Sequence, residues 1–93
     1  MSVVGDYAVR YHPHVLKKDI PALSALDKVS IKKAIEKKLA TAPQVFGMPL
    51  RHTLKAYWKL RVGDFRVIYQ ILDETVLIVK IGHRREVYEG WQP

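Results

Sequence analysis

The sequence predicts an α+β fold: an N-terminal strand, a helical hairpin, and then a mostly antiparallel sheet of three to four strands with the helices packed on one sheet face. Residues 57–88 alternate between apolar and basic or polar side chains with a period of two, which is typical of strands that bury one face. Residues 27–41 instead repeat apolar side chains at near-helical spacing. A chain of 93 residues is long enough to bury one core, so we expect a single domain that spans residues 1–93.

The N-terminal half is expected to supply the first strand and both helices. Alternation over residues 7–12 predicts a short strand, and the proline at position 13 suits the first turn of a helix from about 13 to 22. Ser24 and the acidic residue three positions later resemble a capping box for a second helix from about 27 to 41. The side chains expected to be buried are Leu16, Ile20 and Leu23 on the first helix and Leu26, Ile31, Ile35, Leu39 and Ala42 on the second.

The segment between the helices and the main sheet is expected to be irregular. Residues 44–49 predict a connector in which Phe46 and Met48 pack onto the core as a lid. Residues 50–54 are a candidate short strand that leads into the sheet. No repeat or low-complexity tract interrupts the chain, so the sequence offers no position for a domain boundary.

The sheet itself is expected to consist of three consecutive hairpin-connected strands. The turn pairs Gly63-Asp64 and Asp73-Glu74 divide it into strands at about 57–62, 65–72 and 75–82. Strand parity predicts a buried face made of Trp58, Leu60, Val62, Phe65, Val67, Tyr69, Ile71, Leu77, Val79 and Ile81. The opposite face is expected to stay open and to carry Tyr57 with five cations, namely Lys59, Arg61, Arg66, Lys80 and Arg84. Such a face is suited to binding phosphate groups.

Charge and composition narrow the class of partner. Sixteen Lys and Arg against nine Asp and Glu leave a net charge of +7, which favours a polyanionic partner over a merely basic soluble protein. The absence of cysteine excludes disulfides, thiolate zinc sites and cysteine nucleophiles. No apolar run approaches the roughly 20 residues of a membrane span, and the first residues lack the apolar core of a signal peptide. We therefore expect a cytoplasmic protein with no membrane partner.

Two motifs carry a family resemblance. The run YWKLRVGDFRVIYQ at residues 57–70, followed by GHRREVY at 82–88, resembles the RelE/ParE superfamily of bacterial and archaeal toxins, and most closely its RelE branch. The likeness covers almost the whole chain, including the lysine-rich helical hairpin, and implies the RelE-like microbial RNase fold. It further implies an mRNA interferase that enters the ribosomal A site, cleaves the mRNA there and inhibits translation. A co-encoded RelB-like antitoxin would hold such a toxin inactive.

The resemblance also implies roles for individual residues. It places the cationic catalytic residues of the family at Lys59, Arg66 and Arg84, with Tyr88 as the C-terminal aromatic residue. A second lysine, which some RelE proteins carry two residues before the Lys59 position, is replaced by tyrosine in this sequence. The residues expected to contact RNA in support are Arg61, Tyr57, Lys55, Lys80 and His83.

The expected reaction needs neither a metal nor a cofactor. The 2′-hydroxyl of RNA attacks the adjacent phosphate, leaving a 2′,3′-cyclic phosphate and a 5′-hydroxyl. Arg66 is the expected phosphate clamp, because guanidinium offers a planar fork of donors; its structural alternative is an ion pair with a carboxylate such as Asp64. Lys59 either accepts the proton or only stabilises charge. Arg84 is expected near the leaving group, against the alternative of a solvent-exposed cation at a strand end.

Two further residues have open alternatives. Tyr88 is expected to stack on a base or orient the attacking hydroxyl, or else to anchor the C-terminus in the core. His83 is either an acid or base near neutral pH or a hydrogen-bonded histidine at a strand end. Two other functions stay open: a ParE-like toxin that poisons DNA gyrase by binding, and an inactive RNA-binding relative.

Overall fold

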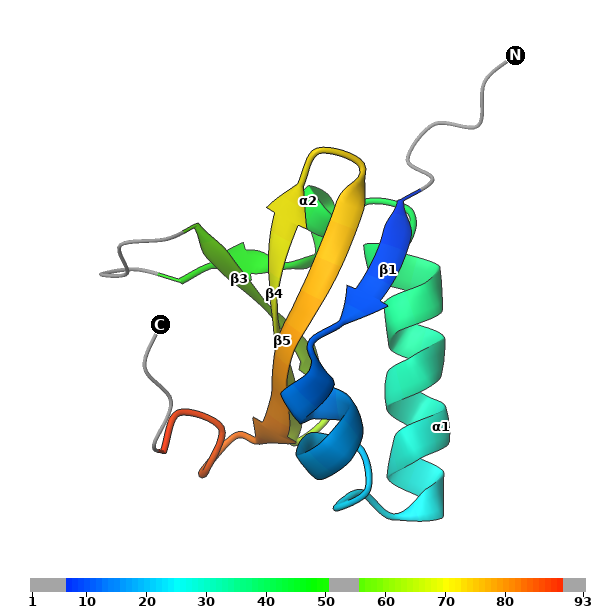
Figure 1. Ribbon diagram of the computed structural model, residues 1–93, viewed down its shortest axis with the longest axis vertical. Helices are drawn as coiled ribbons and strands as arrows, with labels where there is room; N and C mark the ends of the chain where they lie inside the picture. The colour runs from blue at the N-terminus through cyan, green and yellow to red at the C-terminus, as the bar shows by residue number, and fades with distance from the viewer. Residues whose placement is uncertain (1–6, 51–55, 90–93) are drawn as a thin grey trace.

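The computed structural model describes residues 7–50 and 56–89 and consists of a five-stranded sheet with helices against one face (Figure 1). The strands are β1 (Ala8–Tyr11), β2 (Met48–Pro49), β3 (Tyr57–Val62), β4 (Phe65–Leu72) and β5 (Thr75–His83). The helical segments are η1 (Val15–Asp19), α1 (Ala25–Ala34), η2 (Ile35–Leu39) and α2 (Pro43–Phe46). The strand order is β1-β5-β4-β3-β2, and only β1 with β5 is a parallel pair. The predicted α+β fold with a mostly antiparallel sheet is confirmed.

The three main strands begin and end almost where the turn residues predicted. Gly63 has a φ of 57° and Asp73 a φ of 55°, and both lie in the two-residue connections between strands. Glycine adopts this left-handed region without strain, and Asp is among the residues that tolerate it best. Tight turns at these two positions fix the register of β3 against β4 and of β4 against β5.

The helical hairpin also forms, with a cap at the start of α1. The Ser24 hydroxyl oxygen accepts a hydrogen bond from the Asp27 backbone N–H at 3.1 Å, which stabilises the helix by about 1 kcal/mol. At the end of η2, the Ala40 N–H donates to the Ile35 carbonyl at 3.0 Å, a wide i to i+5 turn. Pro43 then starts the short helix α2 after this break.

The core between helices and sheet contains most, not all, of the side chains expected there. Ile31, Ile35 and Leu39 are buried as predicted. The prediction was wrong for Leu26, which is 83% exposed, and for Leu16, which is 53% exposed. The π-helical turn of η1 points Val15 inward instead and buries Asp19 one turn later.

A bulge in the sheet reverses part of the predicted parity. Tyr69 pairs with Ile78 while its neighbour Ile68 pairs with Lys80, so Val79 is an extra residue in β5. Val76, Ile78 and Ile81 therefore face the helices. The burial predicted for Leu77 and Val79 on the helix side was wrong, because the parity changes at the bulge.

The opposite sheet face is not open as expected. Tyr57, Ile68 and Val87 form a second buried cluster there, with Val79 packed against it. Tyr57 is only 8% exposed, so its predicted place on an open face was wrong. Val87 reaches the sheet because Gly82 has no side chain: a β-carbon at Gly82 would lie 3.2 Å from the Val87 Cα. The C-terminal turn thus covers part of this face.

The connector is more regular than expected. It contains α2 and β2, and β2 pairs antiparallel with β3. The buried Tyr69 hydroxyl donates to the Pro43 carbonyl at 2.6 Å, and a β-carbon at Gly47 would overlap that hydroxyl. Burial raises the pKa of Tyr69 above its ordinary value. Residues 51–54 of the candidate strand lie outside the described residues.

The lid prediction was wrong. Phe46 is 47% exposed and Met48 is 63% exposed, so neither side chain is buried on the core. Within residues 7–50 and 56–89, the helices are all too short or too polar to cross a membrane.

Candidate nucleic-acid interface

The predicted cations fall into two rows across the face of the sheet opposite to the helices. In one row Lys59 pairs with Ile68, which pairs with Lys80; in the next, Arg61 pairs directly with Arg66. Two like charges opposite each other in a ladder destabilise the sheet by roughly 0.2–1 kcal/mol. An anion bound between these side chains would relieve their repulsion.

One pocket collects three of these cations, and we call it the cation pocket. Its volume is about 260 Å³, and the described residues that line it are Lys38, Phe46, Met48, Lys59, Leu60, Arg61 and Arg66. Four of the seven are basic, and none is acidic. Among the described residues, no carboxylate lies within ion-pair distance of Lys59, Arg61 or Arg66. The pocket is therefore suited to an anionic ligand.

Arg66 is held in place by the turn that precedes it. Its Nη1 donates to the Gly63 carbonyl at 3.1 Å and to the Phe65 carbonyl at 2.9 Å. In the part of the chain that the structure describes, Nε and Nη2 have no hydrogen-bond partner. The guanidinium is thus anchored by one nitrogen and keeps the donors that a phosphate would need for bidentate binding. The expected alternative, an ion pair with Asp64, does not form.

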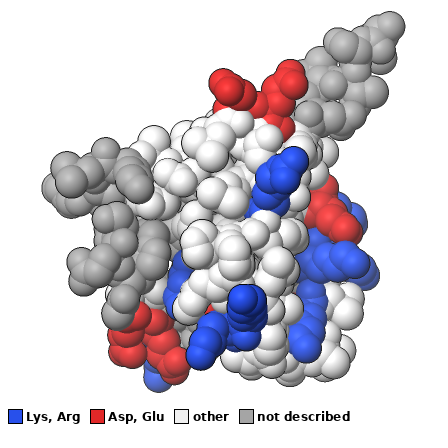
Figure 2. Space-filling view, in the orientation of Figure 1, with Lys and Arg blue, Asp and Glu red and all other residues white. Residues whose placement is uncertain are grey.

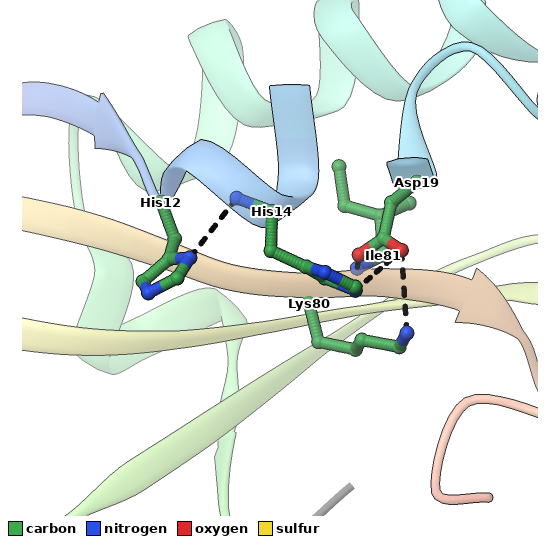
Figure 3. A network of polar contacts seen from close by, with 5 residues as sticks. All are labelled: His12, His14, Asp19, Lys80 and Ile81. Carbon is green, nitrogen blue, oxygen red and sulfur yellow. Dashed lines mark hydrogen bonds and ion pairs between the residues drawn. The ribbon is translucent and has the colours of Figure 1, made fainter. Parts of the chain in front are cut away.

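Lys80 has a different environment. Its Nζ lies 3.2 Å from Asp19 Oδ1, and the other carboxylate oxygen accepts the Ile81 N–H at 2.9 Å (Figure 3). His14 Nε2 lies 3.5 Å from the same Oδ1, and the His14 N–H donates to His12 Nδ1. The predicted cation Lys80 is therefore neutralised by a buried carboxylate, in contrast to Lys59.

Arg84 and Tyr88 lie on the C-terminal turn that follows β5. The Arg84 N–H donates to the Asp64 carbonyl at 2.7 Å, and its guanidinium Nε lies 3.8 Å from the Asp64 carboxylate. Both side chains of that pair are largely exposed, so the pair contributes little to stability. Arg84 and Arg66 are thus tied to the same two-residue turn. Tyr88 is 45% exposed and directly follows Val87, which packs over Gly82 beside Arg66.

The remaining predicted residues do not join the cation pocket. His83 packs edge-on against Phe65 on the helix side, with ring centroids 5.8 Å apart, and its Nδ1 accepts the Arg85 N–H at 3.2 Å. Tyr57 lies in the second buried cluster. Lys55 lies outside the described residues.

Sequence reasoning missed three contributors to this surface. Lys38 and Phe46 reach the cation pocket from η2 and α2, far from the strands in sequence, and no local pattern brings them there. Asp19 was missed because its partners lie about 60 residues away in the chain. Among the described residues, no group of three or more His, Asp or Glu could hold a metal ion.

The surface charge is uneven in the view of Figure 2. Basic side chains gather over the lower half and the right-hand edge, where η1 and α1 lie, while acidic side chains gather at the β4–β5 turn and at the C-terminal turn. A further acidic patch lies among the basic side chains at the right-hand edge (Figure 2), so the two kinds of charge are mixed there.

Comparisons of the sequence with known proteins agree on one superfamily. A family model described as the ParE toxin of the type II toxin–antitoxin system parDE matches residues 9–88. Toxin RelG of Mycobacterium tuberculosis is 38% identical over 52 residues, which are 54% of this chain and 60% of RelG. The match therefore spans less than two thirds of this curated relative.

Solved structures give the same fold. The RelBE2 toxin–antitoxin complex of Mycobacterium tuberculosis matches with a TM-score of 0.78 and 28% identity, over 88% of this chain and 95% of that chain. The intact RelBE complex of E. coli matches with a TM-score of 0.65 and 25% identity, over 83% of this chain and 95% of that chain. The chain therefore belongs to the ParE toxin family of type II toxin–antitoxin systems, within the RelE/ParE superfamily that its two motifs resemble.

Proposed function

We propose that this protein is a ribosome-dependent endoribonuclease that cleaves mRNA in the A site and thereby inhibits translation. The observation that carries the proposal is the cation pocket, in which Lys59, Arg61 and Arg66 converge without an acidic partner among the described residues. A gyrase poison that acts by binding alone has no need for a cluster of cations that repel one another. An RNA phosphate, in contrast, neutralises such a cluster.

The proposed reaction uses the RNA's own 2′-hydroxyl as nucleophile. The 2′-oxygen forms a bond to phosphorus, the bond from phosphorus to the 5′-oxygen breaks, and the products are a 2′,3′-cyclic phosphate and a 5′-hydroxyl. One proton leaves the 2′-hydroxyl and one is delivered to the 5′-oxygen. No step requires an added metal or cofactor.

Each side chain of the pocket has a distinct role in this proposal. Arg66 clamps the phosphate with Nε and Nη2, because its Nη1 is already bound to the turn carbonyls. We assign Lys59 to the nucleophile, where it either takes the proton or stabilises the developing charge. Arg61 supports the phosphate from β3, directly opposite Arg66 on β4.

The C-terminal turn completes the proposed site. Arg84 is tied to the Asp64 side of the same hairpin that anchors Arg66, and on this ground we assign it to the leaving group. Tyr88 is exposed enough to meet a base or the attacking hydroxyl. We leave Lys80 and Tyr57 outside the phosphate site, because one is paired with Asp19 and the other is buried.

The proposed partners are an acidic RelB-like antitoxin, the ribosome and mRNA in the cytoplasm. The two structural relatives described above are toxin–antitoxin complexes, and a net charge of +7 favours an acidic antitoxin. Co-expression with the neighbouring small gene should therefore give a complex that stays together at low salt. Separate elution of the two proteins would contradict this partner.

A second candidate function is gyrase poisoning, favoured by the description of the family model as a ParE toxin. One induction experiment separates the two functions. An mRNA endonuclease should arrest translation and leave cuts within translated codons, which primer extension maps. Arrested replication, intact mRNAs and an SOS response would instead indicate that the protein poisons gyrase.

A further inference from the structure

Two apolar side chains lie exposed beside the proposed catalytic cations. Phe46 and Met48 are 47% and 63% exposed, and both line the cation pocket. Large apolar side chains that are left in water next to a binding site often form part of that site. Phe46 in particular offers a flat surface directly beside a set of phosphate-binding groups.

The segment that carries these two residues is fixed, not loose. The Tyr69 hydroxyl holds the Pro43 carbonyl at 2.6 Å, and Gly47 lies directly against the same hydroxyl. Met48 pairs with Lys59 in the sheet, so its position relative to that lysine is set by the ladder. The apolar surface is therefore pre-organised at a defined place beside the cations.

Lys38 adds a cation to this surface from the helical side. Its Nζ lies 5.9 Å from the centroid of the Phe46 ring, within the range of a cation–π contact. The pocket thus combines an aromatic ring and a thioether with basic groups on both sides. Sites for single-stranded nucleic acid have this composition, because bases stack on aromatic rings while phosphates meet the cations.

We infer that Phe46, with Met48 beside it, is a stacking site for one base of the mRNA, and that Lys38 binds a phosphate next to that base. This inference rests on the proposed function, since it takes the phosphate held by Arg66 as the neighbour of the stacked base. An acidic segment of the antitoxin would also be attracted to the cations. The exposed Phe46 ring beside the anchored Arg66 fork favours a nucleotide, because a base can stack on the ring while its phosphate binds the guanidinium.

The first experiment measures single-turnover cleavage of a model mRNA on programmed ribosomes. Phe46→Ala should slow cleavage about 10-fold, because loss of one aromatic stacking partner typically weakens binding several-fold to about 100-fold. Phe46→Trp should keep most of the rate. Val45→Ala is the matched control: Val45 lies on the same helix, is 72% exposed and does not line the pocket, so its rate should not change.

The same assay tests Lys38 against its neighbour. Lys38→Gln should slow cleavage and weaken its dependence on salt, whereas Lys37→Gln, outside the pocket lining, should do neither. Thermal unfolding of every variant should match that of the wild-type protein, since all of these side chains are exposed.

The decisive experiment measures the cleavage rate of a series of mRNAs, each with one abasic nucleotide at a different position in or next to the codon. At one position, the missing base should slow cleavage by the wild-type protein about 10-fold. The same missing base should not slow the Phe46→Ala variant further, because this variant has already lost the ring on which the base stacks. Equal further slowing of Phe46→Ala at every position would overturn the inference.

Three other outcomes are decisive. If the Phe46→Ala variant cleaves at the wild-type rate while the Arg66→Ala variant is inactive, the stacking site is overturned and the proposed function stands. If the Phe46→Ala variant cleaves at the normal rate but binds the antitoxin more weakly, the surface is a peptide site and the inference is overturned. A wild-type protein that cleaves no mRNA on ribosomes would overturn the proposed function itself, and this inference with it.

Discussion

Lys59 and Lys80 lie at the two ends of one row across the sheet, on either side of Ile68, yet their environments differ. Lys80 lies 3.2 Å from the carboxylate of Asp19, whose side chain is only 6% exposed. Lys59 has no carboxylate within ion-pair distance among the described residues. A shared face therefore does not give two lysines a shared role: the nearby acidic partner decides which charge is available to a ligand.

The two ends also differ in how charge affects folding. At the β5 end, Asp19 satisfies a backbone N–H and a lysine, so the charges stabilise the junction between η1 and the sheet. At the β3–β4 end, Arg61 and Arg66 face each other directly, and the sheet must hold them against their repulsion. The first arrangement stabilises the fold, and the second is a cost that the proposed RNA binding would offset.

The largest effect should come from the β3–β4 end. Under the proposed function, Arg66→Ala should lower cleavage on the order of 100-fold or more, because the guanidinium would contact the phosphate in the transition state. Arg66→Lys should recover only part of the rate, since an ammonium cannot replace a bidentate fork. Single-turnover cleavage and thermal unfolding measure both effects. If Arg66→Ala unfolds the protein, its bonds to the turn are structural and the clamp role fails.

The comparison is sharpened by substituting the two lysines in the same way. Lys59→Gln should lower the cleavage rate about 10-fold or more, and Lys80→Gln should change it less than about 3-fold. The pH dependence of the Lys59→Gln rate separates a proton acceptor from a charge stabiliser, because only loss of an acceptor removes the limb of the profile in which the rate rises with pH. Equal losses for both lysines would mean that the Asp19 pair does not neutralise Lys80.

The β5 end should respond in stability and not in activity. Asp19→Ala leaves the buried Ile81 N–H without its acceptor and Lys80 without its partner, so we expect a loss of about 1–3 kcal/mol in unfolding free energy. Asp19→Asn should lose less, because the amide oxygen can still accept the N–H. Denaturant unfolding measures the loss. Faster cleavage by folded Asp19→Asn would show that a released Lys80 joins the RNA site.

The smallest predicted effect is a pH dependence of stability, which tests the buried Tyr69 hydroxyl that holds the helix carrying Phe46. Burial raises the pKa of Tyr69, so above about pH 10 the unfolded chain releases this proton first and stability falls, by at most about 1.4 kcal/mol per pH unit. Below that pH the Tyr69 hydroxyl contributes its full stability. Tyr69→Phe should remove its share of the alkaline decrease, leaving that of Tyr11, whose pKa is raised by burial and by Glu36. Identical alkaline slopes in the two proteins would contradict this account.

The sequence predicted those features that depend on contacts between residues close together in the chain. It did not predict features that depend on contacts between distant segments. Strand ends followed from Gly63 and Asp73, and the start of α1 followed from Ser24, because turns and caps depend on a few neighbouring residues. The β5 parity failed at Val79, since a bulge depends on pairing between strands and leaves no mark in an alternating sequence.

The candidate site followed the same rule. The cluster of Lys59, Arg61 and Arg66 was predictable from alternation on two adjacent strands. The pairing of Lys80 with Asp19 was not, because it depends on how η1 lies against β5. Phe46 was expected to pack onto the core as part of a lid, but α2 holds it at the surface.

The parallel pairing of β1 with β5 has a consequence for the order of assembly. The β3–β4–β5 meander is built from hairpins of neighbouring residues and can form early, whereas Ala8 meets Thr75 only after most of the chain has been made. The network of Asp19 with Lys80 and the packing of Val87 on Gly82 likewise join segments on both sides of β5. During synthesis, β5 is therefore the last strand to arrive, and the β1 edge of the sheet, the junction with η1 and the C-terminal turn all depend on it. A nascent chain that still lacks β5 can pair β3 with β4 and so place Lys59 near Arg66, but its core lacks Val76, Ile78 and Ile81. We therefore expect the cation pocket to become stably held only when β5 has joined the sheet.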